Sequence, residues 1–283
     1  MNGTKVTIPD IRLAKKEGRK LVMMTAYDYP FGLMADEAGI DIVLVGDSLG
    51  MVVMGLEGTV AVTMEDMIHH IRAVVRGCKN PLVVGDMPFM SYNTSIRDAI
   101  INAGRLMKEG GCDVVKLEGG VDFAPTVAAI VKAGIPVQGH IGLTPQTASA
   151  LGGFKMQGKD VDGAVKIIDD ARALETAGAF SIILEAVPAP LARLVTEAVD
   201  IPVIGIGAGS DVDGQVLVTH DMIGLFDRFI PKFVKQYTKI RPIILEALAA
   251  YKKEVQEETF PAAEHSFKME SETLEQLKNK VQE

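Results

Sequence analysis

The sequence has no tryptophan, and its only two cysteines are Cys78 and Cys112. Neither thiol has a second cysteine or a histidine at metal-ligand spacing, so the sequence indicates neither a disulfide framework nor a thiolate metal site. No stretch approaches the roughly 18 apolar residues that a membrane-spanning helix requires, and the polar N-terminus has no apolar segment of signal-peptide length. We therefore expect a soluble cytoplasmic protein with reduced, partly buried thiols and no membrane partner.

The chain also lacks an excess of positive charge. It contains 29 Lys and Arg against 37 Asp and Glu, for a formal net charge of -8. The basic residues are scattered rather than gathered into one stripe, so nucleic acid is not an expected partner. No linker or low-complexity tract divides the chain, although the apolar strand pattern stops at about Lys232. We predict one domain over residues 1–283, with about 259–283 as a charged C-terminal tail.

Eight apolar segments are spaced along the chain and alternate with segments of helical periodicity. Near-continuous apolar strands are typical of parallel sheets that are buried on both faces. The pattern predicts an α/β fold, a (β/α)8 TIM barrel with additional terminal helices, and leaves an open doubly wound sheet as the alternative. The predicted strands cover residues 21–27, 40–45, 81–87, 112–118, 137–141, 180–186, 201–207 and 215–219.

Four of these strands end at an acidic residue. The second strand is followed by Gly46 and Asp47, and three others end at Asp86, Glu118 and Glu185. The carboxyl ends of parallel strands meet at one edge of a barrel, which is where the active sites of such barrels lie. The acids therefore indicate a divalent-metal or acid/base site at the mouth of the barrel.

The fourth strand carries two charged residues that should face the interior. Side chains alternate along a strand, so Lys116 and Glu118 project to one side while Val115 and Leu117 face the outer helices. A buried lysine and glutamate this close can form a purely structural ion pair, and that interpretation remains open. The acids on neighbouring strands favour a functional site.

The strand-end residues suggest a division of roles. A magnesium ion takes one or two carboxylates and completes its shell with water and substrate oxygens. Asp47, Asp86 and Glu118 are candidates for that shell. Lys116 would then neutralise an anionic substrate, and Glu185, further round the barrel, would remain free of metal and act as a base.

Several other features allow two interpretations. His140 ends the fifth predicted strand and is either a core histidine or a substrate contact, whereas His220, placed at the end of the eighth, is more simply structural. The glycine-rich segment Gly205–Gly209 is either an anion-binding turn or a site of tight packing. The long connection Leu49–Val62 is a candidate for a mobile flap over the site.

Short segments at the strand ends match one family pattern. Through them, from about residue 5 to 237, the chain resembles the 3-methyl-2-oxobutanoate hydroxymethyltransferase family, also called ketopantoate hydroxymethyltransferase. The matching segments are Met24-Thr25-Ala26-Tyr27-Asp28, Val45-Gly46-Asp47-Ser48-Leu49-Gly50, Gly85-Asp86-Met87-Pro88-Phe89, Val115-Lys116-Leu117-Glu118-Gly119, Gly139-His140-Ile141-Gly142-Leu143-Thr144-Pro145-Gln146, Leu184-Glu185-Ala186-Val187-Pro188, Ile204-Gly205-Ile206-Gly207-Ala208-Gly209 and Val218-Thr219-His220-Asp221.

The resemblance implies a specific reaction. It is a magnesium-dependent transfer of a one-carbon unit from 5,10-methylenetetrahydrofolate to 3-methyl-2-oxobutanoate, which gives 2-dehydropantoate and tetrahydrofolate in the first step of pantothenate synthesis. Chelation of the 2-oxo acid would stabilise an enolate. The resemblance also implies a homodecamer. It assigns Glu185 as the proton acceptor, Asp47, Asp86 and Glu118 to the metal site, and Asp47, Ser48, Asp86, Lys116 and His140 to the keto acid.

Two alternatives come from other classes. One is a carbon-carbon lyase or mutase of the related barrel superfamily, which also works through metal-bound enolates. Those lyases resemble one another in a Lys-Lys-Cys-Gly-His run that this chain lacks. The other is a barrel retained as a scaffold or regulatory subunit, which a fold alone does not exclude. The intact metal and base positions argue against it.

Overall fold

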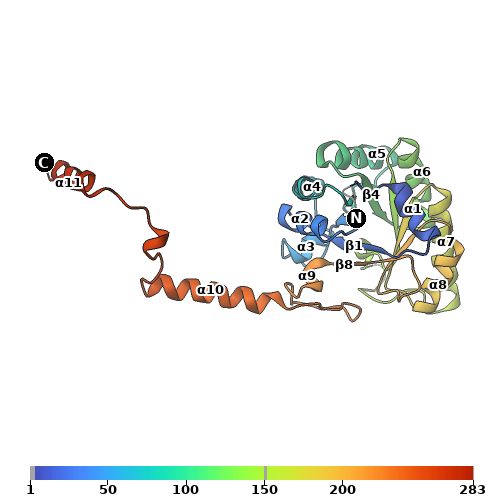
Figure 1. The fold of residues 1–283 in the computed structure, drawn as a ribbon. Coiled ribbons are helices and arrows are strands. Elements are labelled where there is room, and N and C mark those ends of the chain that lie inside the picture. The colour runs from blue at the N-terminus through green and yellow to red at the C-terminus, as the bar shows by residue number, and fades with distance from the viewer. Residues whose placement is uncertain (1–3, 150–151, 283) are drawn as a thin grey trace.

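The computed structural model describes residues 4–149 and 152–282. Eight parallel strands pair in sequence order and close into a barrel, because the last strand pairs with the first (Figure 1). The predicted TIM barrel is confirmed, and the open doubly wound sheet is wrong. The strands are β1 (Leu21–Thr25), β2 (Ile42–Val45), β3 (Leu82–Asp86), β4 (Val114–Glu118), β5 (Val137–Gly142), β6 (Ser181–Glu185), β7 (Val203–Ile206) and β8 (Gly214–Leu217).

Helices surround the barrel up to α9, except that α1 packs against the inward-facing residues at one end of it. Thr63 caps α4 with a reciprocal bond to Asp66, as the capping pattern predicts. The first helix begins at Ile8, where Thr7 and Asp10 form a capping box. The helices are α1 (Ile8–Lys16), α2 (Tyr29–Glu37), α3 (Leu49–Val52), α4 (Met64–Gly77), α5 (Ile96–Arg105), α6 (Ala124–Lys132), α7 (Val161–Thr176), α8 (Ala189–Ala198), α9 (Thr219–Met222), α10 (Ile240–Gln256) and α11 (Ser271–Val281).

The strands are buried on both faces, which explains their unbroken apolar sequence. Val43, Val115 and Leu117 face outward and pack in one cluster with the surrounding helices. A second cluster fills the barrel, and in it Ile11 and Ala14 of α1 pack against the inward-facing strand residues. The barrel interior is therefore largely apolar below the polar groups at the carboxyl ends of the strands, with Gln138 and Ser181 as a buried, mutually hydrogen-bonded polar pair.

The prediction for the eighth strand needs a correction. The strand ends at Leu217, and Thr219 and His220 belong to the short helix α9. The Thr219 N–H bonds to Oγ1 of Thr25, and the Thr219 hydroxyl donates to the Thr25 carbonyl, so β1 ties down the start of the helix instead of extending the sheet.

The C-terminal helices α10 and α11 lie away from the barrel (Figure 1). Neither contains a buried residue, and α10 exposes Ile243, Leu248 and Tyr251. Among the described residues, contacts with the barrel are confined to the start of α10, where the Ile240 N–H donates to the Ile223 carbonyl and Arg241 pairs with Asp227, so they contribute little to the stability of the helix. The assignment of residues 1–283 to a single domain stays a prediction. Among the helices of residues 4–149 and 152–282, none combines the length and apolarity that a bilayer crossing demands.

Candidate active site

The site lies where the strands end, and the strand register brings its residues together. Lys116 pairs with Asp86 between β3 and β4, and His140 pairs with Glu118 between β4 and β5. Lys116 Nζ lies 2.8 Å from Asp86 Oδ1, and both side chains are at most 3% exposed. The buried lysine is thus paired across strands with Asp86 and not with Glu118 of its own strand. Whether this ion pair is structural or functional stays open on geometry alone.

Asp47 lies in the turn after β2 and joins this cluster. Its backbone N–H donates to Asp86 Oδ2 at 3.1 Å, and its own Oδ2 accepts from Gln146 Nε2 at 2.8 Å. Its neighbour Ser48 lies on the same wall, with its hydroxyl 2.8 Å from that of Tyr27. The turn therefore places a carboxylate and a hydroxyl side by side.

Electrostatics in the cluster favour a cation. Burial, together with the charges of Asp86 and Glu118, raises the pKa of Asp47 well above its usual value. Burial also raises the pKa of Asp86, although Lys116 opposes the rise. Burial alone would lower the pKa of Lys116, but the charges of Asp86, Glu118 and Asp47 outweigh it and raise that pKa. The lysine remains charged, and the carboxylates outnumber it.

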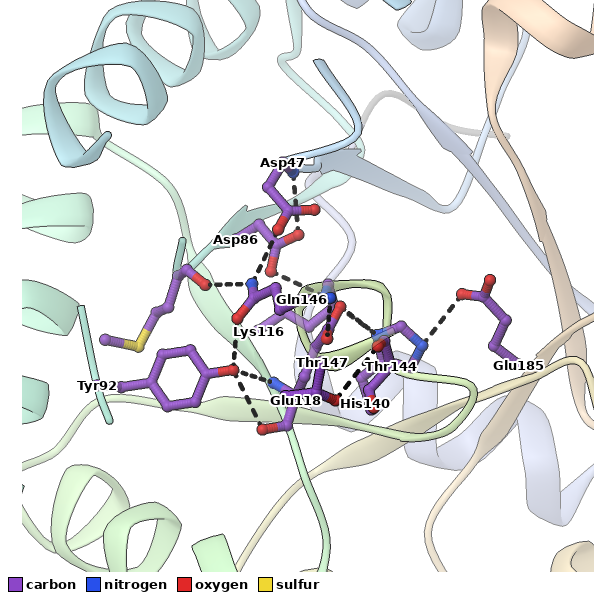
Figure 2. Close-up of polar contacts among 11 residues, drawn as sticks. Asp47, Asp86, Tyr92, Lys116, Glu118, His140, Thr144, Gln146, Thr147 and Glu185 are labelled. Carbon is purple, nitrogen blue, oxygen red and sulfur yellow. Dashed lines mark hydrogen bonds and ion pairs between the residues drawn. The ribbon is translucent and has the colours of Figure 1, made fainter. Parts of the chain in front are cut away.

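His140 lies between two carboxylates (Figure 2). Its Nδ1 is 3.4 Å from Glu118 Oε1 and 3.3 Å from Lys116 Nζ, while its Nε2 is 3.2 Å from Glu185 Oε2. Burial and the Lys116 charge lower the pKa of His140, but Glu118 and Glu185 outweigh them and raise it to about 9. Glu185 keeps a side chain that is 15% exposed, so it faces the cavity with one flank supported by the histidine.

Two residues that hold the cluster together were not singled out from the sequence. Gln146 donates from Nε2 to Asp47 and to the Met87 carbonyl, and its backbone N–H donates to Glu118 Oε2 at 3.0 Å. Tyr92 donates to Gln146 Oε1 at 2.7 Å and accepts from the Glu118 backbone N–H at 3.2 Å. Both come from loops after strands. Gln146 ends one of the matching family segments, but nothing in the sequence gave it a role, and no motif marks Tyr92.

The Tyr92 hydroxyl can be tested by its removal. Tyr92→Phe should lower the free energy of unfolding by about 1–3 kcal/mol, because it leaves Gln146 Oε1 buried without its donor. Denaturant unfolding measures the change. Tyr29→Phe, at a side chain that is 48% exposed, is the matched control and should be neutral. Equal stability of the two variants would show that the Gln146 contact contributes nothing.

The acids were also predicted to hold magnesium. Among the residues that the structure describes, no three His, Cys, Asp or Glu side chains form a group that could hold a metal ion alone. Two buried aspartates with oxygen-only donors nevertheless fit Mg²⁺, which takes few protein ligands. Glu118 is occupied on both sides by Gln146 and His140. The predicted ligand set of Asp47, Asp86 and Glu118 stays a prediction.

All of the predicted site residues line one cavity of about 1020 Å³. Met51 and Thr59, from the predicted flap Leu49–Val62, line it as well. Closure of that segment stays a prediction. At Gly207 a Cβ atom would lie 2.6 Å from the Phe233 ring, so tight packing accounts for this glycine of the glycine-rich segment.

His220 and the two thiols lie outside the acid cluster. His220 packs against the rings of Tyr27 and Phe31, at 5.2 and 5.4 Å between centroids. This ring packing agrees with the expectation that His220 has a structural role. Cys78 and Cys112 are free and buried, and burial raises the pKa of each thiol to about 12. Neither cysteine is suited to nucleophilic chemistry.

The fold and the cluster together define a class. A parallel (β/α)8 barrel with a buried lysine, a histidine and several carboxylates at the carboxyl ends of its strands is the architecture of an enzyme for a small anionic substrate. A family model described as ketopantoate hydroxymethyltransferase matches residues 5–263. The chain belongs to this family.

Individual relatives agree with the family match. The chain is 57% identical over 273 residues to the 3-methyl-2-oxobutanoate hydroxymethyltransferase of Carboxydothermus hydrogenoformans, with 96% of this chain and 99% of the relative covered. It is 59% identical over 268 residues to the protein of the same name from Heliobacterium modesticaldum, with 95% and 97% covered. The resemblance drawn from the strand-end segments is thereby confirmed.

Solved structures of lower identity share the fold. Phosphonopyruvate hydrolase in complex with oxalate and Mg²⁺ superposes with a TM-score of 0.61 at 12% identity, covering 97% of this chain and 96% of that one. For 2,3-dimethylmalate lyase, a member of the PEP mutase/isocitrate lyase superfamily, the TM-score is 0.58 at 15% identity, with 97% and 98% covered. The family match places the chain apart from the lyases that formed the alternative.

Proposed function

We propose that this enzyme of the ketopantoate hydroxymethyltransferase family transfers a hydroxymethyl group from 5,10-methylenetetrahydrofolate to 3-methyl-2-oxobutanoate, giving 2-dehydropantoate and tetrahydrofolate. Relatives with this name align with the chain over nearly their whole length. The observation that carries the chemistry is one cavity in which a buried, charged Lys116 and a partly exposed Glu185 flank the aspartates.

The keto acid would bind by its charged end. Lys116 remains protonated at neutral pH, and a carboxylate group brought into the cavity compensates for the loss of hydration of both ions. The Ser48 hydroxyl, next to Asp47, adds a hydrogen-bond donor on the same wall. Lys116 and Ser48 would thus hold the carboxylate end of the substrate, and Glu185 of β6 lines the same cavity.

Asp47 and Asp86 would hold the divalent cation, with Glu118 behind them. When bound, the cation supplies positive charge that makes the C3 proton of a 2-oxo acid easier to remove. The excess of buried negative charge around Asp47 is the observation that supports a cation here. Phosphonopyruvate hydrolase, which shares the fold, was solved with oxalate and Mg²⁺, so Mg²⁺ is the first ion to test.

Glu185 would take the C3 proton. Asp47, Asp86 and Glu118 are buried, whereas the Glu185 side chain is 15% exposed. Glu185 lines the cavity from the end of β6. His140 Nε2, 3.2 Å away, restricts the orientation of that carboxylate. The resulting carbon nucleophile forms a bond to the one-carbon unit of the folate, and both carbon–nitrogen bonds of the methylene bridge break. One water supplies the hydroxyl oxygen of the product and the two protons that tetrahydrofolate carries away on its nitrogens, while the C3 proton ends on the new hydroxyl.

We also propose that the protein is a cytoplasmic homodecamer, as the family resemblance implies. The exposed apolar side chains of α10 are consistent with contacts to other subunits.

Removal of the metal tests this function. Enzyme treated with EDTA should lose at least about 100-fold in 2-dehydropantoate formation from the two substrates, because the aspartates alone cannot stabilise negative charge on the keto acid. Added Mg²⁺ should restore the rate. The same preparation, offered 2-methylisocitrate, should cleave none of it. Full turnover in EDTA would contradict the metal proposal, and cleavage would favour the lyase alternative.

A further inference from the structure

The cavity has a second region that the keto acid does not use. The acid cluster occupies the side formed by β2 to β6, whereas the wall at β7 and the segment after α9 is apolar. At about 1020 Å³, the cavity is at the upper limit of typical ligand pockets and exceeds the needs of a small keto acid. The apolar wall is formed by Ile206, Phe226, Phe229, Phe233 and Val234.

One carboxylate lies in this second region. Asp221 lines the cavity and is only 7% exposed, yet its Oδ1 has no hydrogen-bond partner among the described residues. Burial raises its pKa to about 6, so it is ionised at neutral pH. Oδ1 is enclosed by protein atoms, so a donor that enters the cavity would reach the other side of the carboxylate and offset part of the cost of burying it.

Asp221 is held in place firmly. Two hydrogen bonds between Thr219 and Thr25 attach α9 to β1, and the ring of His220 packs between Tyr27 and Phe31. The carboxylate therefore projects from a helix that is anchored on both sides. A rigidly placed acceptor of this kind provides orientation and specificity rather than simple charge.

Two aromatic side chains flank the same region and are unusually open. Phe229 is 61% exposed and Phe233 is 38% exposed, although both line the cavity. Phe233 rests on the backbone of Gly207, where any side chain would collide with the ring. Exposed rings beside a cavity favour a ligand that is planar and largely apolar.

We infer that this region binds the folate, with the pterin ring against Phe229 and Phe233 and its N3–H and 2-amino group donating to the Asp221 carboxylate. Two adjacent N–H donors on a flat ring can both be directed at the side of the carboxylate that lines the cavity. Lys232, exposed at the rim of the cavity, faces the carboxylates of the glutamate tail. This inference rests on the proposed function and names where its second substrate lies.

Binding of tetrahydrofolate, followed by calorimetry, tests the inference without turnover. Asp221→Asn should weaken binding by roughly 10- to 100-fold, because an amide cannot accept both donors. Asp227→Asn removes the same charge from a side chain that is 58% exposed and should bind like the parent. Lys232→Met should weaken binding of p-aminobenzoyl-glutamate, which has no pterin, and Asp221→Asn should leave that binding unchanged.

Equal tetrahydrofolate affinity in Asp221→Asn and the parent would overturn the inference. If Asp221→Asn fails to fold, Phe229→Ala at the exposed ring is the second variant, and unchanged affinity there would also overturn it. Exchange of the keto-acid C3 hydrogen with deuterated water needs no folate. Its absence in the parent would contradict the proposed function, whereas normal exchange with normal folate binding in the variants would contradict only the placement of the folate.

Discussion

Glu185→Gln should lose roughly 10²- to 10⁴-fold in turnover, the range assigned to a positioned acid/base group, while its binding of the keto acid and Mg²⁺ remains close to that of the parent. Glutamine has nearly the same shape as glutamate but cannot accept a proton. The side chain lies outside the buried aspartate cluster and contacts only His140 among the charged groups described. The variant therefore separates proton removal from binding.

Isotope exchange isolates this step. In deuterated water with Mg²⁺ and no folate, the parent should exchange the C3 hydrogen of 3-methyl-2-oxobutanoate with solvent, and Glu185→Gln should not. Glu197→Gln, on the exposed face of α8, is a matched control and should exchange at the parental rate. Exchange at the parental rate in Glu185→Gln would assign the proton to another group, with His140 the first candidate.

Lys116→Met should destabilise the folded chain by about 3–5 kcal/mol, the typical cost of leaving one partner of a buried ion pair uncompensated. Asp86 is 2% exposed and would lose the cation that lies 2.8 Å away. The variant should also raise the KM for the keto acid, because the charge facing its carboxylate is gone. Denaturant unfolding without metal and initial rates measure the two effects.

A double variant and a pH series separate charge from packing. Lys116→Met with Asp86→Asn should recover much of the stability and none of the activity, since the carboxylate that Lys116 contacts directly is then replaced by a neutral amide. In Lys116→Met alone, the pKa of Asp86 should rise further, so the folded chain binds a proton more tightly than the unfolded chain. The loss of stability should then shrink as the pH falls from the folded towards the unfolded pKa of Asp86. A loss that does not vary with pH would show that the lysine acts through packing.

Much of the architecture could be predicted from local pattern. All eight strands were expected. A parallel barrel buries both faces of each strand, so the residues of each strand are apolar in an unbroken run. The strand ends were less certain. Thr219 continues the apolar pattern of β8, but its hydrogen bonds to Thr25, distant in the chain, start a helix instead.

The supports of the site could not be predicted in the same way. Gln146 and Tyr92 lie on different loops and meet at Glu118 only after the barrel closes. A glutamine or tyrosine in a polar loop belongs to no periodic pattern from which burial of its side chain could be predicted. The same is true of Asp221, whose free oxygen becomes apparent only when its surroundings are known.

By itself, the sequence determined the class of fold, the family and the identity of the acids at the strand ends, because these depend on local composition and on segments a few residues long. Tertiary structure alone decided the pairing. The strand register sets Lys116 against Asp86 and His140 between Glu118 and Glu185, and closure of β8 on β1 carries α9 to the cavity. Electrostatic and hydrogen-bond energies depend on distances between residues far apart in the chain, and only the closed barrel sets those distances.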